Sequence, residues 1–418
     1  MLQPIQSKVD TLAQLKAGKL QGVKQLNLQC GLTQFPQEIF NLADSLEILD
    51  LTGNALSALP NDLTRLKKLR IIFCSSNQFT HLPEVLGECK NLSMIGFKAN
   101  QIKHIPESAI PTATLRWFIV TDNALRTVPN ALGECRQLQK LMLAGNQLTT
   151  LPTSMANCDA LELLRISANQ FQALPDLLFD LPNLTWLAYA GNPFCNELEQ
   201  NLMRQHQVNH IDWQTLTLQN VLGQGASGIT YQALWQNNGL QEPVAVKLFK
   251  SDLTSDGLPR CEMHANILAG EHPNLVGVKG VIHNHPQGTL GLVMPLLDAD
   301  LKVLADPPSF ESCSRDVYAK DLKLTPKQAQ HILNSVRQAA EHLHKQGLMH
   351  GDLYAHNILW RTDKIMSQKA VPPKVMLSDL GGASFLPLDN QALTQNLLKL
   401  EARALEVLSQ ELKRYTPN

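Results

Sequence analysis

A repeat of 23 residues runs through the first half of this 418-residue chain and restricts its fold more than any other feature. Nine-residue segments that begin with leucine and end with asparagine recur, starting with LEILDLTGN at Leu46. The leading leucines are Leu46, Leu69, Leu92, Leu115, Leu138, Leu161 and Leu184, and the closing asparagines are Asn54, Asn77, Asn100, Asn123, Asn146, Asn169 and Asn192. Such regular recurrence predicts an array in which each repeat is one structural unit stacked on its neighbours.

The pattern within each repeat resembles the leucine-rich repeat, L-x-x-L-x-L-x-x-N/C-x-L. We therefore expect one short strand per repeat, with the in-phase leucines stacked into a continuous core. The asparagine side chains should hydrogen-bond backbone groups where the chain leaves each strand. Cys89, Cys135 and Cys158 share one phase of the repeat, and we expect them to be buried core residues rather than disulfide or metal partners.

Two columns of strand residues, two and four positions after each leading leucine, should face the concave surface of the array, because side chains alternate along a strand. Large apolar and aromatic residues gather in these columns, namely Phe73, Met94, Trp117, Ile119, Met142 and Trp186. Because aromatic residues and methionine are enriched at binding hot spots, we expect an exposed patch that recruits a protein partner or substrate. The alternative is that the chain's own second domain covers part of the patch.

The repeats end after Asn192, and the sequence on either side predicts helices that cap the array. SKVDTLAQLKAG predicts a short helix before the repeats, and residues 196–207 predict a polar helix after them. The predicted organisation is a leucine-rich repeat domain with helical end caps over residues 1–210, followed by a second domain over residues 211–418.

Glycines at G-x-G-x-x-G spacing open the second domain, at Gly223, Gly225 and Gly228 in LGQGASGITY. Glycine permits a tight turn in which backbone amides approach phosphate groups with no side chain in the way. Dinucleotide-binding folds place this spacing at a strand-to-helix junction, whereas here it stands between two predicted strands. The context therefore argues against dinucleotide binding.

Further segments with polar residues beside apolar strands follow in order. PVAVKLFK carries Lys247 on a predicted strand, and CEMHANIL carries Glu262 on a predicted helix. GLVMPLL predicts another strand, and TPKQAQHILNSVRQAAEHLHKQG predicts a helix that begins with a T-x-x-Q capping box. LMHGDLYAHNILW and KVMLSDLGG then contribute Asp352, Asn357 and Asp379. This order of motifs resembles the protein kinase domain.

The resemblance implies an α+β protein-kinase-like domain of two lobes after the α/β repeat solenoid, with ATP and Mg²⁺ as cofactors. By position in the motifs, Asp352 would accept the proton of the substrate hydroxyl, Lys247 would position ATP, and Glu262 would hold Lys247. Asn357 and Asp379 are the implied magnesium ligands. The residues implied in nucleotide binding are Leu222, Gly223, Gly225, Ala226, Ser227, Gly228, Thr230, Ala245, Lys247, Met294, Leu297 and Leu359.

Two positions depart from the kinase pattern. Gly351 replaces the arginine that normally clamps a phosphorylated activation loop, and Tyr354 replaces a lysine usual in serine/threonine kinases. The chain ends soon after Asp379 without an A-P-E motif, which indicates a truncated large lobe whose central helix carries Glu401 where an aspartate is usual. With so short an activation loop, arginine at Gly351 should change little. A lysine at Tyr354 could raise the rate by adding charge near the transferred phosphoryl.

These features predict a protein kinase that transfers the ATP γ-phosphoryl to protein hydroxyls, with serine or threonine favoured over tyrosine. The repeat domain would recruit a protein partner or substrate. The alternatives are a nucleotide-binding pseudokinase scaffold and a kinase-like enzyme acting on a small molecule. Because Lys247, Asp352, Asn357 and Asp379 are all present, an active enzyme is favoured over a decayed one.

Composition sets broader limits on function. Lys+Arg 36 and Asp+Glu 37 give a net charge of -1, which indicates neither nucleic acid nor an anionic membrane as a partner. The N-terminal segment is not typical of a signal peptide, and no apolar stretch is long enough to cross a bilayer. The eight cysteines show no C-x-x-C pairing, which favours reduced thiols and a cytoplasmic location.

Two other classes of repeat protein are disfavoured by the sequence. A GTPase would need the motif G-x-x-x-x-G-K-[ST], which is absent. A cysteine-dependent ligase would need acidic and basic residues around its nucleophile, and no such set surrounds Cys195.

Overall fold

The computed structural model describes residues 8–225, 227–250, 253–361, 364–366, 369–371 and 373–416. The chain forms two compact units. The first comprises the chain up to Leu164 together with Asn169–Leu184, and the second comprises Arg165–Ala168 together with Thr185 and all later residues. The division runs through the last two repeats, whereas the sequence placed the domain boundary at residue 210.

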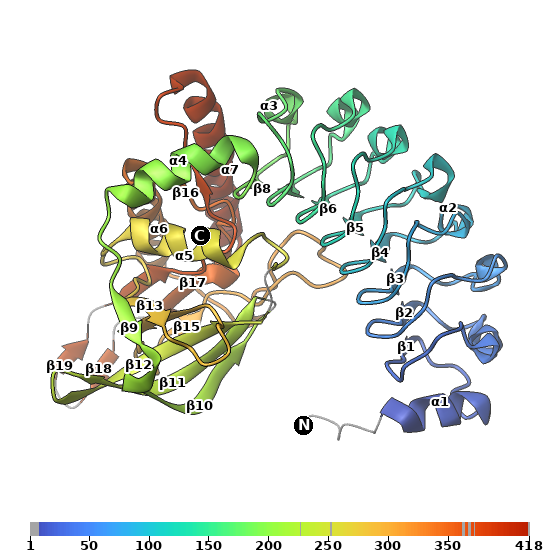
Figure 1. Ribbon diagram of the computed structural model, residues 1–418, viewed down its shortest axis with the longest axis horizontal. Helices are drawn as coiled ribbons and strands as arrows, with labels where there is room; N and C mark the ends of the chain where they lie inside the picture. Colours follow the sequence, from blue (N-terminus) through green and yellow to red (C-terminus); the bar gives the residue numbers. More distant parts are fainter. Residues whose placement is uncertain are drawn as a thin grey trace. The chain divides into compact units, whose positions relative to one another are not determined.

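Short parallel strands form the sheet of the repeats, in the order β1-β2-β3-β4-β5-β6-β7-β8. Each strand from β2 onward begins two residues after the leading leucine of its repeat. Their bounds are β1 Gln25–Asn27, β2 Ile48–Asp50, β3 Ile71–Phe73, β4 Met94–Gly96, β5 Trp117–Ile119, β6 Lys140–Met142, β7 Leu163–Arg165 and β8 Trp186–Ala188. In Figure 1 the strands of the first unit lie side by side along one edge of the array, with helical turns along the other.

Helical segments connect the strands and flank the repeats. The predicted helix before the repeats is α1 (Lys8–Lys16), and the polar helix after them is α4 (Pro193–Arg204), which starts three residues earlier than expected. The connecting turns are η1 Gln37–Leu42, η2 Leu63–Arg65, α2 Val85–Glu88, η3 Glu107–Ala109, η4 Asn130–Glu134, η5 Thr153–Asn157 and α3 Leu177–Asp180.

The repeat asparagines hydrogen-bond the backbone as predicted. The side-chain amide of Asn77 donates to the carbonyl oxygens of Leu51 at 2.9 Å and Cys74 at 3.1 Å. Its Oδ1 accepts from the Leu56 amide at 2.9 Å. Since Asn77 is itself buried, these bonds satisfy polar groups that would otherwise be unpaired inside the array.

The core of the array consists of the leading leucines and the apolar residues three positions after them. Leu92 and Ile95, for example, have no exposed surface. Cys89, Cys135 and Cys158 are buried free thiols, which confirms that they are core residues. Burial raises the pKa of the Cys135 thiol to about 12, so it stays protonated.

The two columns expected to face the concave surface are less exposed than predicted. Phe73, Trp117, Ile119 and Met142 are half-buried, whereas Met94 and Trp186 are each 1% exposed. Met94 is flanked in register by Ile71 and Trp117 on the adjacent strands, and an apolar neighbour on each side leaves its side chain little exposed surface. The prediction of an exposed patch is therefore wrong for Met94, and for Trp186, which lies in the second unit.

The second unit contains a six-stranded sheet in the order β10-β11-β12-β14-β13-β9. Its strands are β9 His210–Asp212, β10 Leu216–Gln224, β11 Gly228–Asn237, β12 Leu240–Phe249, β13 Gly280–His283 and β14 Gly291–Pro295. The turn η6 (Trp213–Thr215) precedes β10, and helix α5 (Pro259–Ala269) follows β12. Met263 of α5 packs with Phe249, Val281 and Leu292, which fixes the helix against the sheet.

The rest of the second unit is built on two long helices, α6 (Pro326–Lys345) and α7 (Gln391–Arg414). This part also contains short strands and one turn, namely β15 Lys302–Val303, β16 Leu348–Met349, η7 Ala355–Asn357, β17 Ile358–Arg361, β18 Lys364–Met366, β19 Lys369–Val371, β20 Lys374–Leu377 and β21 Ser384–Phe385. The predicted capping box is present, since Thr325 Oγ1 accepts from the Gln328 amide and Gln328 Oε1 accepts from the Thr325 amide. An α/β repeat solenoid followed by an α+β kinase-like unit confirms the predicted fold class.

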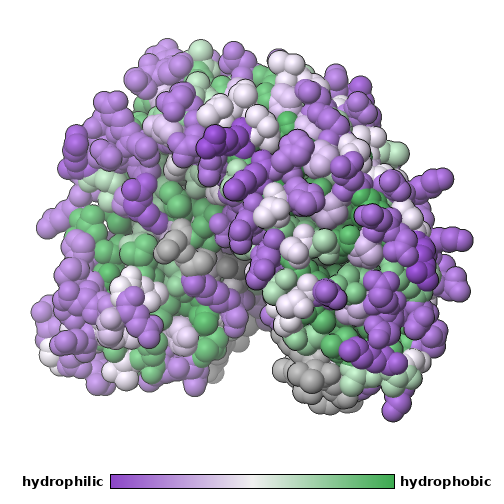
Figure 2. Space-filling model, turned by 45° about the vertical axis from the view of Figure 1, so that its right-hand side comes forward, coloured by the Kyte–Doolittle hydropathy of each residue, from purple (hydrophilic) through white to green (hydrophobic). Residues whose placement is uncertain are grey.

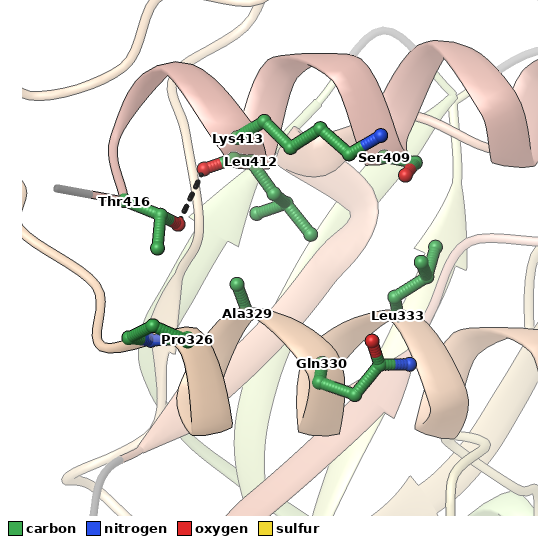
Figure 3. A pocket seen from close by; sticks show the side chains of 8 residues that line it. All are labelled: Pro326, Ala329, Gln330, Leu333, Ser409, Leu412, Lys413 and Thr416. Atoms are coloured by element: carbon green, nitrogen blue, oxygen red, sulfur yellow. Dashed lines mark hydrogen bonds between the residues drawn. The ribbon is translucent and has the colours of Figure 1, made fainter. Parts of the chain in front are cut away.

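A pocket of about 470 Å³ separates part of α6 from the end of α7. Figure 3 shows its lining, with Ala329 and Leu333 on α6 facing Leu412 on α7, and the hydroxyl of Thr416 donating to the Leu412 carbonyl at 2.9 Å. None of the predicted catalytic or nucleotide-binding residues lines this pocket.

On the face of the molecule drawn in Figure 2, hydrophilic side chains predominate and hydrophobic ones form smaller areas between them. Among the described residues, no helix combines the length and the apolar character needed to cross a membrane.

Candidate active site

The glycine-rich segment forms the turn between β10 and β11. The Gly225 amide donates to the Gly228 carbonyl at 3.0 Å, and a Cβ at Gly228 would lie 2.5 Å from the Leu248 carbonyl oxygen. At Gly223 and Gly225 a Cβ would meet nothing within 4 Å, so the backbone there is open to a ligand. Ala226, which was also predicted in this loop, lies outside the described residues.

A cleft of about 340 Å³ lies beside this turn. The predicted residues that line it are Gly223, Gly225, Ser227, Gly228, Thr230, Lys247, Glu262, Met294, Leu297, Leu359 and Asp379. Two residues predicted to bind nucleotide are not part of the lining. Leu222 is 50% exposed, and Ala245 is buried in β12 opposite Met294.

Some residues line the cleft although the sequence did not single them out, namely Gln224, Asn266, Val276, Leu292, Ser378 and Leu380. Leu292 lies two residues before Met294 on β14, so the alternation of side chains along that strand could have identified it. Val276 comes from a connection between elements, where no periodic pattern marks the residues that turn inward.

Lys247 on β12 and Glu262 on α5 form an ion pair in the cleft lining, with Nζ 2.5 Å from Oε1. Glu262 is only 4% exposed. Burial alone would lower the pKa of the Lys247 ammonium, but the carboxylates of Asp379 and Glu262 raise it above its ordinary value. Lys247 therefore stays positively charged close to the open glycine turn, an arrangement that suits an anionic phosphate group.

The predicted residues of the catalytic segment come together around η7. The side-chain amide of Asn357 donates to the Asp352 carbonyl at 2.9 Å and to Asp352 Oδ2 at 3.3 Å. The Ser378 amide donates to the Asn357 carbonyl at 2.9 Å, which places Asp379 next in the chain. Asp379 adopts a φ of 59°, a conformation that residues with a side chain rarely adopt outside functional or tightly constrained sites.

Helix α7 places the buried carboxylate of Glu401 against the start of this segment. Glu401 Oε1 accepts from the backbone amides of His350 at 2.6 Å and Gly351 at 3.0 Å, and Oε2 is hydrogen-bonded to His344. Burial alone would raise the pKa of Glu401, but the His344 hydrogen bond and the nearby histidine charges hold it below its ordinary value. An ionised glutamate at this position thus anchors the backbone that leads into Asp352.

Gly351 cannot be replaced by a larger residue without strain. Its φ is 70°, and a Cβ would lie 2.3 Å from the Gly382 carbonyl oxygen and 2.7 Å from that of Leu187 in β8. The expectation that arginine here would change little is therefore wrong, because both the backbone conformation and the surrounding carbonyls exclude a side chain.

Residues of the last repeat pack directly against the catalytic segment within the second unit. The Trp186 ring stacks on the Tyr354 ring with centroids 4.0 Å apart, and Trp186 Nε1 donates to the Leu353 carbonyl at 3.0 Å. Tyr189 donates from its hydroxyl to the Phe385 carbonyl at 2.8 Å. These contacts explain why the division between the units falls within the repeats, and they support the alternative that the second domain covers the patch at Trp186.

One further side chain from the repeats lies at the site, whereas Cys195 on α4 has no role there. Arg165 on β7 lies beside Asp352, 187 positions away in sequence, and no local motif marks it as a site residue. Cys195 is 1% exposed, and burial raises the pKa of its thiol well above the ordinary range, which agrees with the view that it is no nucleophile.

Comparisons with known proteins agree with this architecture. Residues 216–418 match the family model described as protein kinase domain, and residues 136–194 match the model described as leucine rich repeat. Cyclin-dependent kinase 10 of Rattus norvegicus is 28% identical over 193 residues, covering 45% of this chain and 47% of that protein. Cyclin-dependent kinase 11.2 of Caenorhabditis elegans is 25% identical over 143 residues, covering 34% of this chain and 20% of that protein.

This chain spans less than half the length of both relatives. Among solved structures, the plant peptide hormone receptor RGFR1 in complex with RGF2 has a TM-score of 0.37 and 27% identity, covering 43% of this chain and 30% of that one. The two family matches and the cleft described above lead to one assignment: the chain joins leucine-rich repeats to a protein kinase domain.

Proposed function

We propose that this chain is a protein kinase that transfers the γ-phosphoryl group of ATP to protein hydroxyls, with serine and threonine favoured over tyrosine. The observation that carries the proposal is the cleft in which the open glycine turn, Lys247, Glu262 and Asp379 come together. The relatives named above are kinases by name, which supports the same class of reaction.

The cleft fits a nucleotide and its metal ion. Apolar residues such as Val276, Leu292 and Met294 suit an adenine ring, and the glycine amides suit phosphate oxygens. Asn357 and Asp379 offer the oxygen donors that Mg²⁺ prefers. Within the described ranges, no three His, Cys, Asp or Glu side chains are grouped so as to hold a metal, so the ion would rely on nucleotide phosphates for further ligands.

Each residue of the site would have a separate role in the reaction. Lys247, held by Glu262, would bind the phosphates, and magnesium bound at Asp379 and Asn357 would neutralise their charge. Asp352 would accept the proton of the attacking hydroxyl, while the Asn357 amide fixes its carbonyl and one carboxylate oxygen. The proposal is tested by transfer of labelled phosphate from ATP to an acceptor. Nucleotide binding without transfer would favour the pseudokinase scaffold instead.

Magnesium-ATP is expected to raise the melting temperature of the full chain, by about 5 °C or more at a hundredfold excess over Kd. Lys247→Ala should abolish the shift because it removes the cation that meets the phosphates. Lys399→Ala, which removes an exposed lysine on α7, is the matched control and should keep the shift. A full shift in Lys247→Ala, or none in the unaltered protein, would count against this binding site.

We further propose that the first unit binds a protein partner or substrate through the half-buried residues of its concave columns, Phe73, Trp117, Ile119 and Met142. The buried side chain of Lys140 lies over the Trp117 ring, with Nζ 4.7 Å from the centroid, and this contact helps to hold the indole in place. Aromatic side chains at the centre of a surface are the usual anchors of protein interfaces.

Trp117→Asp should weaken retention of co-purifying proteins at least tenfold while leaving the melting temperature of the array within a few degrees. Arg136→Ala, at an exposed position of the same array, should leave retention unchanged. Pull-down of the full chain followed by quantitative mass spectrometry measures the effect. Equal retention by both variants would exclude Trp117 from the interface, and unfolding of Trp117→Asp would show that the indole is part of the core.

A further inference from the structure

The catalytic segment lacks a cation at the position where the resemblance to protein kinases places a lysine. Tyr354 stands there, is 5% exposed, and stacks on Trp186. The Asp352 side chain is 18% exposed, so its ionised carboxylate is only partly hydrated and gains from a cation held beside it.

Arg165 supplies such a charge from β7. Its side chain is 1% exposed, and its Nη2 donates to Asp352 Oδ1 in a short hydrogen bond. Its Nη1 lies 3.4 Å from the carbonyl oxygens of Trp186 and Gly351. Its Nε donates to Asp256 Oδ1 at 2.8 Å. The guanidinium is thus held by two carboxylates and two backbone carbonyls, so its own position is well defined.

The Asp352 carboxylate is consequently held on both sides. Arg165 binds Oδ1, and the side-chain amide of Asn357 lies 3.3 Å from Oδ2. A carboxylate with both oxygens engaged cannot rotate freely, so the lone pair that would meet a substrate hydroxyl has a fixed direction. Orientation of this kind matters, because a misplacement of about 1 Å can lower a rate by about a hundredfold.

We propose that Arg165 is the positioning residue of Asp352, and that the repeats thereby provide the cation which the catalytic segment lacks at Tyr354. This inference rests on the proposed kinase function. It assigns the penultimate repeat strand a part in catalysis, beyond partner recruitment. It also removes the reason for expecting a faster enzyme with lysine at Tyr354, because a cation already meets Asp352 and the substitution would lose the stacking on Trp186.

The kinetic test uses the full chain and compares Arg165→Met, which keeps bulk without charge, with Arg165→Lys, which keeps charge. Phosphate transfer from ATP to dephosphorylated casein is measured with magnesium. Arg165→Met should lower kcat about a hundredfold while the KM for ATP stays within about twofold. Arg165→Lys should recover at least about a tenth of the lost rate. Arg136→Ala, at an exposed position of the repeats, should leave kcat and KM unchanged.

The outcomes separate the inference from the function on which it rests. No transfer by the unaltered protein would overturn the proposed function itself. Transfer by the unaltered protein with an equal kcat in Arg165→Met would overturn the positioning role alone. A higher kcat in Arg165→Met would also overturn it, because Arg165 would then inhibit Asp352 as the proton acceptor instead of positioning it. Equal losses in the Met and Lys variants would show that Arg165 matters for packing rather than for charge.

A second measurement does not depend on activity. Thermal unfolding of the full chain is compared for Arg165→Met, Asp352→Asn and the double variant, so that coupling between the two residues can be isolated. Arg165→Met should lower the melting temperature by several degrees because it leaves the half-buried carboxylates of Asp256 and Asp352 without the cation between them. Adding Asp352→Asn should recover part of that loss. Strictly additive effects would overturn the ion pair, and if Arg165→Met fails to fold, Arg165→Gln, which is also uncharged, takes its place in the cycle.

Discussion

Gly351→Ala is expected to lower the stability of the second unit by about 2–4 kcal/mol, because one added methyl group meets both a steric and a conformational obstacle. The Cβ would lie 2.3 Å from one carbonyl oxygen and 2.7 Å from another, and the backbone φ of 70° disfavours any side chain. A loss of this size corresponds to a melting temperature lower by about 10 °C in a domain of this size. Gly351→Arg should be at least as damaging.

Gly239→Ala provides a matched control for that experiment. Gly239 also has a positive φ, of 82°, but a Cβ there would meet no atom within 4 Å. Replacing it with alanine should therefore lower the free energy of unfolding by only about 1 kcal/mol, because the unfavourable backbone conformation is the sole obstacle. Thermal unfolding of both variants by calorimetry gives the comparison. An equal loss of stability in Gly351→Ala and Gly239→Ala would show that the nearby carbonyls of Leu187 and Gly382 are not the reason for glycine at position 351.

The repeat fold was predictable from sequence because its information is periodic. A 23-residue period with leucine and asparagine in fixed phase leaves one arrangement in which the apolar positions stack and the asparagines meet backbone groups. Asn77 hydrogen-bonds the backbone in this way in the structure.

The exposure of side chains along the strands was harder to predict, since it depends on neighbours in register. Met94 has the same place in its repeat as Trp117, yet it is enclosed while Trp117 is half-buried.

The cleft was also largely predictable, because each of its polar residues lies in a local motif. Lys247 and Glu262 are 15 residues apart on consecutive elements, and they pair in the structure. Residues that reach the cleft from connections, such as Val276, have no comparable motif.

The sequence allowed the alternative that the second domain covers part of the patch, but it could not predict which residues of the last repeats contact the catalytic segment. Arg165 and Trp186 occupy ordinary strand positions, and nothing nearby in sequence distinguishes them from residues that face solvent. Their partners, Asp352 and Leu353, are 187 and 167 positions away. Gly351 is a sign of this packing in the local sequence, because a side chain there would collide with the Leu187 carbonyl. The position of that carbonyl cannot be read from the sequence.

Asp352→Asn is expected to remove nearly all phosphate transfer, by about 10²–10⁴-fold, while leaving nucleotide binding intact. Asparagine keeps the shape of the side chain but cannot accept the hydroxyl proton. Asp352 is not among the residues that line the nucleotide cleft, so the magnesium-ATP shift in melting temperature should persist. Arg165 would keep Asp256 as its ionic partner in this variant.

The most direct test of the account is a side-by-side assay of labelled phosphate transfer from ATP by the unaltered full chain and by Asp352→Asn. Both proteins are first treated with phosphatase, which is then removed. The unaltered chain should label itself or dephosphorylated casein without a lag, since Gly351 leaves no arginine to clamp a phosphorylated loop. Asp352→Asn should incorporate about 1% of that label or less. Equal incorporation by the two proteins, or none by the unaltered chain with several acceptors and with either magnesium or manganese, would contradict the assignment of this chain as an active kinase.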